Sequence, residues 1–211
     1  MRKLQRSFFL RSNVILISTH LIGKYLFTQL HPCGCAEQSR SRNAKTGGMI
    51  VEVEAYAGPQ DRASHAYGNR RTKRTEIMYS KGGVAYVYLC YGIHSLFNIV
   101  TNVEDIPHAI LVRAIQPTHG ISTMLKRRKK KKNDRSIAGG PGALTQALGI
   151  DTSHNGAKLS GNQIWLEDRD VVIPPAQIEA LPRVGIDYAG KDAKRPWRFR
   201  IKNNPWTSNA K

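Results

Sequence analysis

Acidic residues are scarce in this chain of 211 residues, which has 15 Asp and Glu against 33 Lys and Arg. The formal net charge of +18 means that the protein surface attracts anions, which favours a polyanionic partner. A carboxylate close to the binding surface would repel such a partner unless it had a chemical role, for example as a general base. Each acidic residue beside aromatic side chains is therefore a candidate for catalysis.

Cysteine is also rare. The three cysteines, Cys33, Cys35 and Cys90, cannot all pair, which favours free thiols in a reducing compartment. The Cys33-Gly34-Cys35 spacing is too weak a signal for a metal site, and no second ligand lies at metal-binding spacing from His65. We expect neither a metal nor another cofactor.

Long apolar runs are lacking as well. Near the amino end, Phe8-Phe9-Leu10 is interrupted by Arg11, so we expect no signal peptide and no membrane association. The length fits one domain with an ordinary core, which we expect to span residues 1–211.

Seven Lys and Arg residues fill positions 126–132. Removing them from +18 leaves +11, so the basic character is spread over the chain. Because like charges repel, we predict a mobile basic loop over residues 126–136. The alternative is that the run adds salt-sensitive contacts to phosphates.

The segment of residues 50–56 alternates apolar and polar side chains and predicts a strand. One face is apolar, and the other carries Glu52, Glu54 and Tyr56. Two interpretations are open: an edge strand with a solvated acidic face, or a carboxylate that acts as a general base beside a tyrosine. The basic composition favours the second.

Residues 61–75 follow the turn signal Gly58-Pro59 and are polar, basic and without clear periodicity. We interpret them as a functional loop. For His65, a structural hydrogen bond to a backbone carbonyl is an equally good interpretation.

Residues 84–91 and 95–101 are rich in β-formers and flank Gly92, which predicts a β-hairpin with Tyr91, Ile93 and His94 at its tip. We expect Tyr86 to pack within the sheet. An exposed aromatic and aliphatic pair suits a wedge that unstacks DNA base pairs from the minor groove.

Arg113 lies in the apolar run of residues 109–115, where a charge is costly unless it is paired. Its natural partner is Glu54. Such an ion pair would keep Glu54 ionised, as a general base must be.

Helices are predicted at residues 14–26, 118–128 and 141–148, the last with Pro141 at its start and Gly149 at its end. Strands are expected near residues 48–56, 84–91, 95–101, 109–115, 163–166 and 197–202. The fold class is α+β: a single mixed domain with a curved, mainly antiparallel β-sheet surrounded by helices and a protruding β-hairpin.

Several long strings in register resemble the alkyladenine (3-methyladenine) DNA glycosylase family, and the resemblance covers most of residues 14–207. The strings, in chain order, are LIGKYL, GGMIVEVEAYAGPQDRASHAY, RRTKRTEIMY, GVAYVYLCYGIHSLFNIVT, AILVRAIQP, GGPGALTQALGI and RVGIDYAGKDAKRPWRFRIKNNPW.

The resemblance implies a monofunctional DNA glycosylase of base excision repair. Such an enzyme flips alkylated or deaminated purines, of the 3-methyladenine, 7-methylguanine or hypoxanthine type, out of duplex DNA. It then hydrolyses the N-glycosidic bond with an activated water and leaves an abasic site.

The resemblance also assigns roles. Glu54 matches the general base, while Arg113 and the main-chain carbonyl of Val184 match the groups that hold the water. Tyr56, His65 and Tyr88 match the base pocket, and Asn98 matches a residue on its rim. Tyr91 and its apolar neighbour Ile93 match the residues that enter the DNA stack.

Three departures from the family pattern stand out. Ala143 occupies a place where relatives commonly carry lysine, which puts one contact to the DNA backbone in doubt. Gln116 replaces a common glutamate, and Ser80-Lys81 replaces a Gly/Pro-rich turn before the hairpin.

The expected partner is double-stranded DNA bound through the minor groove, by a monomer without an obligate protein partner. The expected location is the cytoplasm of a bacterium, or the nucleus if the source is eukaryotic. Two other classes are open: a non-catalytic DNA-binding module, in which Glu54 would be dispensable, and a glycosylase-lyase. The second needs an amine nucleophile, and no lysine falls among the matched pocket positions.

Overall fold

The computed structural model describes residues 1–30 and 44–210, so the Cys33-Gly34-Cys35 motif lies outside the described residues. Within them, all strands belong to one sheet with the order β1-β7-β2-β3-β6-β5-β4, and β9 pairs with both β3 and β8. The strands are β1 (Arg2–Lys3), β2 (Tyr25–Thr28), β3 (Thr46–Tyr56), β4 (Ala85–Cys90), β5 (His94–Thr101), β6 (His108–His119), β7 (Ile164–Asp168), β8 (Ile178–Leu181) and β9 (Arg198–Ile201).

The α-helices are α1 (Arg6–Phe9), α2 (Val14–Leu21), α3 (Ile121–Arg128) and α4 (Pro141–Leu148). Short 3-10 helices occupy the connections: η1 (Gly58–Gln60), η2 (Tyr67–Asn69), η3 (Glu76–Tyr79), η4 (Arg135–Ile137), η5 (Thr152–His154), η6 (Pro175–Gln177) and η7 (Asp187–Lys194). The predicted α+β class with a curved antiparallel sheet is confirmed.

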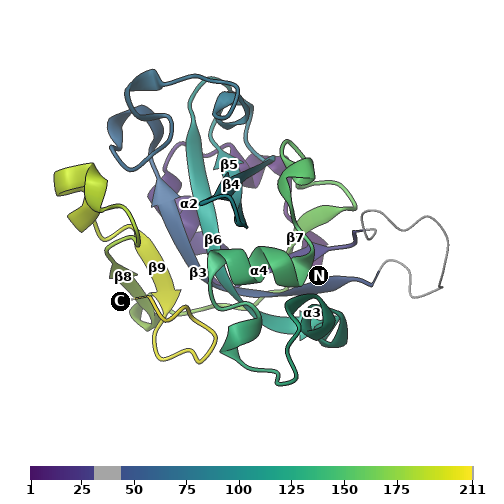
Figure 1. Ribbon diagram of the computed structural model, residues 1–211. Helices are drawn as coiled ribbons and strands as arrows, with labels where there is room; N and C mark the ends of the chain where they lie inside the picture. The colour runs from purple at the N-terminus through teal and green to yellow at the C-terminus, as the bar shows by residue number, and fades with distance from the viewer. Residues whose placement is uncertain (31–43, 211) are drawn as a thin grey trace.

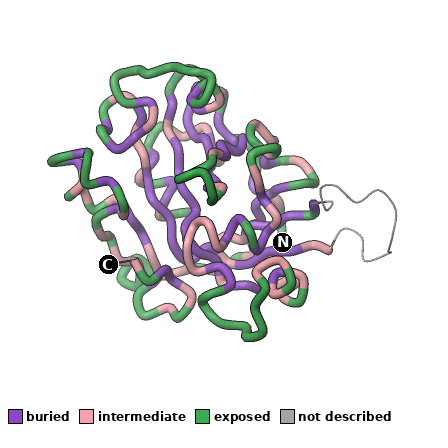
Figure 2. Tube along the Cα trace, in the orientation of Figure 1, coloured by how far each residue is buried: buried purple, intermediate pink, exposed green. Residues whose placement is uncertain are grey.

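The long strands β3 and β6 form the middle of the sheet, with α4 in front of them and α2 behind (Figure 1). Apolar residues from both helices and from the sheet make up the main core, including Ile17, Leu21, Leu144 and Leu148. The buried strands run through the centre of the molecule, and the exposed segments are mainly the connecting loops (Figure 2).

The part of β3 that carries Glu52 and Glu54 pairs with β6 on one side and with β9 on the other. Both carboxylates are fully buried. The interpretation of this segment as an edge strand with a solvated acidic face is therefore wrong. Register shifts on either side of Glu52 mark a bulge, a device that re-aims side chains next to functional sites.

The helix predicted for residues 14–26 is too long. It ends at Leu21, and Gly23, with φ +86, turns the chain into β2. Leu26 and Phe27 are both fully buried within the sheet. A short strand that is buried on both faces has a continuous apolar pattern, which periodicity alone does not separate from a buried helix.

The helix predicted for residues 118–128 begins later, at Ile121, because β6 continues to His119 and Gly120 caps the helix with φ +67. The loop predicted for residues 126–136 is wrong for its first three residues, which form the last turn of α3. There Arg127 donates hydrogen bonds to the Ala147 carbonyl and to Thr46. Three basic residues at a helix carboxyl end also favour the helix dipole.

The predicted helix of residues 141–148 is confirmed, with Gly149 as its left-handed cap. The predicted pairing of the two hairpin strands is confirmed, because β4 and β5 pair from Ala85↔Ile99 to Cys90↔His94, which leaves Tyr91, Gly92 and Ile93 in the turn. The placement of His94 at the tip is wrong, since this residue begins β5. The short strands β1, β2 and β8 were missed. In the part of the chain that the structure describes, no helix has the length and apolar character needed to span a membrane.

Candidate active site

A cavity of about 480 Å³ lies between β3, the loop after it, the β4-β5 hairpin, β6 and residues 184–188. Its size is within the usual range for small-molecule sites. Tyr56, His65, Tyr88 and Asn98, which the family resemblance assigns to a base pocket, all line it. These residues come from β3, β4, β5 and the intervening loop, so the fold brings together side chains that are far apart in the chain.

Glu54 lies behind the wall of this cavity, and its contacts Tyr56, Arg113 and Val184 are part of the wall. Its Oε1 is 3.1 Å from Nη1 of Arg113 and accepts a hydrogen bond of 2.8 Å from the Val184 amide. Its Oε2 accepts a hydrogen bond of 2.9 Å from the Tyr56 hydroxyl. The predicted proximity of Glu54 and Arg113 is confirmed.

For Val184, the contact observed is the amide N–H to Glu54. The water-holding role of its carbonyl stays a prediction. The amide is a donor to Glu54 that no sequence pattern predicts, because its position depends on how the loop before η7 packs against β3.

A second buried carboxylate, Glu52, shares Arg113 with Glu54. Nε of Arg113 donates to Oε1 of Glu52 at 2.9 Å. Burial opposes the charge of the guanidinium, but the charges of Glu54 and Glu52 outweigh burial and raise the pKa of Arg113. The position of Glu52 two residues before Glu54 was a usable signal, since alternate strand residues share a face.

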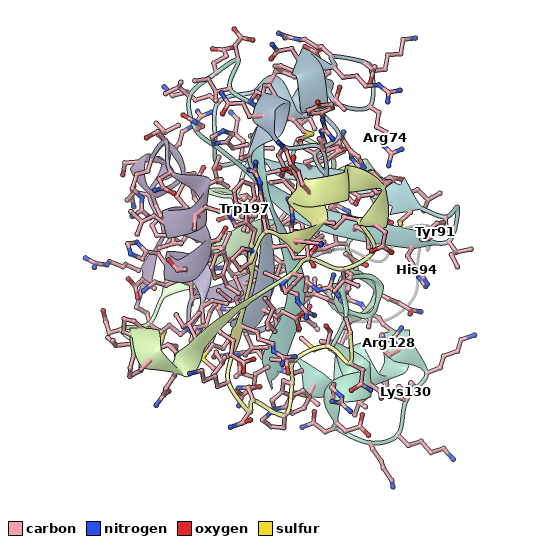
Figure 3. All side chains as sticks on the ribbon, turned by 90° about the vertical axis from the view of Figure 1, so that its left-hand side faces the viewer. Arg74, Tyr91, His94, Arg128, Lys130 and Trp197 are labelled. Atoms are coloured by element: carbon pink, nitrogen blue, oxygen red, sulfur yellow. The ribbon has the colours of Figure 1, made fainter. Side chains whose placement is uncertain are left out.

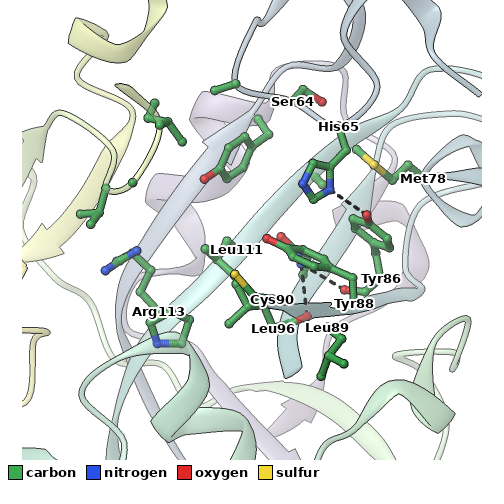
Figure 4. A pocket seen from close by; sticks show the side chains of 18 of the residues that line it. Ser64, His65, Met78, Tyr86, Tyr88, Leu89, Cys90, Leu96, Leu111 and Arg113 are labelled. Atoms are coloured by element: carbon green, nitrogen blue, oxygen red, sulfur yellow. Dashed lines mark hydrogen bonds between the residues drawn. The ribbon is translucent and has the colours of Figure 1, made fainter. Parts of the chain in front are cut away.

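His65 and two tyrosines of β4 form the aromatic side of the cavity. His65 Nδ1 and the Tyr86 hydroxyl are 2.8 Å apart, and the rings of His65 and Tyr88 meet edge to face with their centroids 4.7 Å apart. Figure 4 shows this hydrogen bond, with the Tyr88 ring beside it and Arg113 away from both. Tyr86 therefore packs in the sheet, as expected, and also lines the cavity.

Burial and the charges of Arg74 and Arg70 lower the pKa of His65 to about 4, so the imidazole is neutral near pH 7. Burial, followed by the charge of Glu54, raises the pKa of Tyr56 well above its usual value. The Tyr56 hydroxyl therefore keeps its proton and remains a hydrogen-bond donor to Glu54.

Two arginines that sequence reasoning missed stack on the aromatic rings. Arg183 lies 4.8 Å from the centroid of Tyr56 and forms a fully buried ion pair with Asp61, with Nη2 and Oδ1 2.8 Å apart. Arg74 lies 4.8 Å from the centroid of Tyr88 and is exposed. Asp61 follows the Gly58-Pro59 turn, but no local pattern links it to a residue more than a hundred positions away.

Asn98 is buried in β5, where its side-chain amide donates to the carbonyl of Tyr86 at 3.1 Å. At the hairpin tip, by contrast, Tyr91 is 89% exposed and Ile93 is 72% exposed. Tyr91 has φ 50, a backbone conformation that bulky residues rarely adopt, so the turn holds it in place.

The hairpin projects from a basic side of the molecule. Figure 3 shows Tyr91 and His94 on this side, between Arg74 at one end and Arg128 and Lys130 at the other. In residues 1–30 and 44–210, no three His, Cys, Asp or Glu side chains gather in a way that could hold a metal ion.

A cavity with aromatic walls and a buried carboxylate, next to an exposed hairpin tip on a basic side, is typical of enzymes that act on a single base of DNA. The family model described as methylpurine-DNA glycosylase (MPG) matches residues 7–205, and the chain belongs to this family. It is accordingly a hydrolase of N-glycosyl bonds in DNA and a DNA repair enzyme, as the sequence resemblance implied.

The bacterial relatives named below cover between 83% and 98% of the chain. A protein of Chlamydia felis is 41% identical over 199 residues, which are 94% of this chain and 95% of the relative. One from Natranaerobius thermophilus is 41% identical over 98% of each chain, and one from Bacillus licheniformis is 45% identical over 83% of this chain and 87% of the relative. The printed name of all three is "Putative 3-methyladenine DNA glycosylase".

Proposed function

We propose that this DNA glycosylase flips alkylated or deaminated purines from duplex DNA into the cavity and hydrolyses the N-glycosidic bond with a water activated by Glu54. The observation that carries the proposal is the position of Glu54. It is fully buried behind the cavity wall, beside the guanidinium of Arg113 and the hydroxyl of Tyr56.

The exposed hairpin tip accounts for flipping. Extruding a base costs a few kcal/mol in lost stacking and pairing. Tyr91, supported by Ile93, would fill the vacated stack from the minor groove, a role that the exposure of both side chains in the turn supports. Tyr91 also lines the mouth of the cavity, so the space left in the duplex and the pocket for the base lie next to each other.

The aromatic cavity accounts for the preference for alkylated purines over normal bases. An alkylated purine such as 3-methyladenine carries positive charge, and a cation gains attraction over electron-rich rings such as those of Tyr56 and Tyr88. A neutral His65 does not repel that charge. Asn98, at the position the family uses as a gatekeeper, would meet the edge of the base.

The chemistry follows from Glu54 and Arg113. Glu54 accepts a proton from water, the water oxygen bonds to the sugar carbon C1′, and the bond from C1′ to the purine nitrogen breaks, with its electron pair leaving on the purine. The carboxylate also stabilises the positive charge that develops on the sugar. Arg113 and the Val184 carbonyl would hold the water.

Among the described residues that line the cavity there is no lysine, which supports a monofunctional hydrolase over a glycosylase-lyase. We further propose that the enzyme works as a monomer on DNA in the bacterial cytoplasm. The relatives named above are bacterial and lend no support to a nuclear location.

The test is base release from duplexes that carry hypoxanthine, 7-methylguanine or 3-methyladenine, with borohydride added to parallel reactions. We expect free base and an abasic site without any covalent adduct between protein and DNA. A trapped adduct would show a lyase mechanism. Tight binding of duplex without release of any base would support a binding module instead.

A further inference from the structure

The segment of residues 207–210 contacts the buried carboxylate of Glu52 through Ser208. The Ser208 amide donates to Oε2 of Glu52 at 2.6 Å, and its hydroxyl donates to Oε1 at 2.8 Å. Ser208 and Glu52 are both buried, although 156 positions separate them. We infer that Glu52, clamped by Ser208, is a positioning residue that orients Arg113 for base excision.

The hydrogen bonds of Arg113 show how this orientation is set. Its Nε donates to Glu52, its Nη1 lies 3.1 Å from Glu54, and its Nη2 donates to Ser208 Oγ at 3.4 Å. A guanidinium is planar and carries five N–H donors in fixed directions, so anchoring Nε and Nη2 fixes where Nη1 points. The remaining N–H groups are then free to face the cavity, whose wall includes Arg113.

Glu52 is suited to this task because it has no part in lining the cavity and its two oxygens are occupied by protein donors. Arg198 adds a charge 3.6 Å from Glu52 Oε1 and also donates to the carbonyl of Ala210 at 3.1 Å. The segment of residues 207–210 is thus tied to β3 through Glu52 and to β9 through Arg198. Removing these donors from a buried carboxylate would cost much folding free energy, so Glu52 and the segment of residues 207–210 hold each other in place.

The inference rests on the proposed function, since it assigns Arg113 to the excision step. In Glu52→Gln, the amide preserves the shape but removes the negative charge that faces Nε. In Ser208→Ala, the hydroxyl is lost while the backbone amide stays. Because Arg113 would no longer be held at one angle to Glu54, and small misplacements of a catalytic group cost up to ~100-fold, we expect single-turnover base release to fall by about one to two orders of magnitude in both variants.

Binding separates positioning from loss of the fold. We expect the affinity for damaged duplex to stay within about threefold of wild type, because neither Glu52 nor Ser208 lines the cavity. Ser208→Thr keeps the hydroxyl and should restore release, while Ser160→Ala and Glu104→Gln, at exposed positions, serve as matched controls. Wild-type release rates in Glu52→Gln and Ser208→Ala, or equal losses of release, binding and thermal stability that Ser208→Thr does not reverse, would overturn the inference.

A spectroscopic measurement keeps this test distinct from that of the proposed function. The Nε–H of Arg113, observed by ¹⁵N NMR, should exchange slowly with water in wild type and faster in Ser208→Ala. Normal exchange in that variant would overturn the positioning role even if the enzyme released no base. Absence of base release from wild type on every lesion would overturn the proposed function alone.

Discussion

The Tyr56 hydroxyl donates a hydrogen bond of 2.9 Å to Oε2 of Glu54, two residues earlier on the same strand. Tyr56 thus has two tasks, because its ring lines the cavity while its hydroxyl holds the carboxylate behind the wall. Since Oε1 of Glu54 contacts Arg113 and the Val184 amide, both carboxylate oxygens are held by protein donors.

Tyr56→Phe should separate these two tasks. The ring stays, but Oε2 of Glu54 loses its donor, so the carboxylate is held less firmly. Because small misplacements of a catalytic group cost up to ~100-fold, we expect base release to slow by about one to two orders of magnitude. Single-turnover base release measures this effect, and binding of damaged duplex should change little. Tyr25→Phe, on β2, is the control; equal behaviour of the two variants would contradict the role of the Tyr56 hydroxyl.

Tyr91→Ala should weaken the complex with damaged duplex much more than the complex with undamaged duplex. The exposed ring contributes only when a base has left the stack, and stacking of an aromatic side chain is worth about 1–3 kcal/mol. Affinities for both duplexes at one salt concentration measure the difference, with Val172→Ala as a control at another exposed apolar position. Equal losses on both duplexes would argue against a wedge.

His65 should make the fold sensitive to acid. Its pKa is about 4 in the folded protein, below the usual value of 6.5, so the unfolded chain binds more protons between these two values. The free energy of unfolding therefore falls as the pH decreases from 6.5 to 4, by up to about 3 kcal/mol from this group. Denaturant unfolding of wild type and His65→Gln across this range measures the contribution. If the difference in unfolding free energy between wild type and His65→Gln stayed constant from pH 6.5 to 4, the proposed titration of His65 would be wrong.

Ala143→Lys should strengthen binding to any duplex. Ala143 lies in the first turn of α4, which packs against the hairpin through the hydrogen bond from Thr145 Oγ1 to the Ser95 carbonyl, 2.6 Å long. One added phosphate contact makes the slope of log K against log salt steeper by about 0.9. Ala176→Lys adds the same charge at an exposed position in η6, and an equal change there would indicate a general effect of charge.

The sequence alone predicts those elements whose ends are marked by neighbouring residues. Pro141 and Gly149 mark the ends of α4, and the β-formers around Gly92 mark the hairpin. It was misleading where tertiary structure decides, because the apolar pattern of residues 14–26 does not show that Gly23 divides a helix from a strand.

The site divides in the same way. The Glu54–Arg113 contact was predictable because a charge in an apolar strand needs a partner. The contacts of Glu52 with Ser208 and of Asp61 with Arg183 were not, since each joins segments more than a hundred residues apart without a pattern that links them.

Single-turnover release of hypoxanthine or an alkylated purine by wild type and Glu54→Gln tests the central claim most directly. The substitution removes the carboxylate that acts as the general base and nearly preserves the shape of the side chain. We predict that release disappears in Glu54→Gln while binding of damaged duplex survives, with Glu104→Gln behaving as wild type. Release at an undiminished rate by Glu54→Gln would contradict the account.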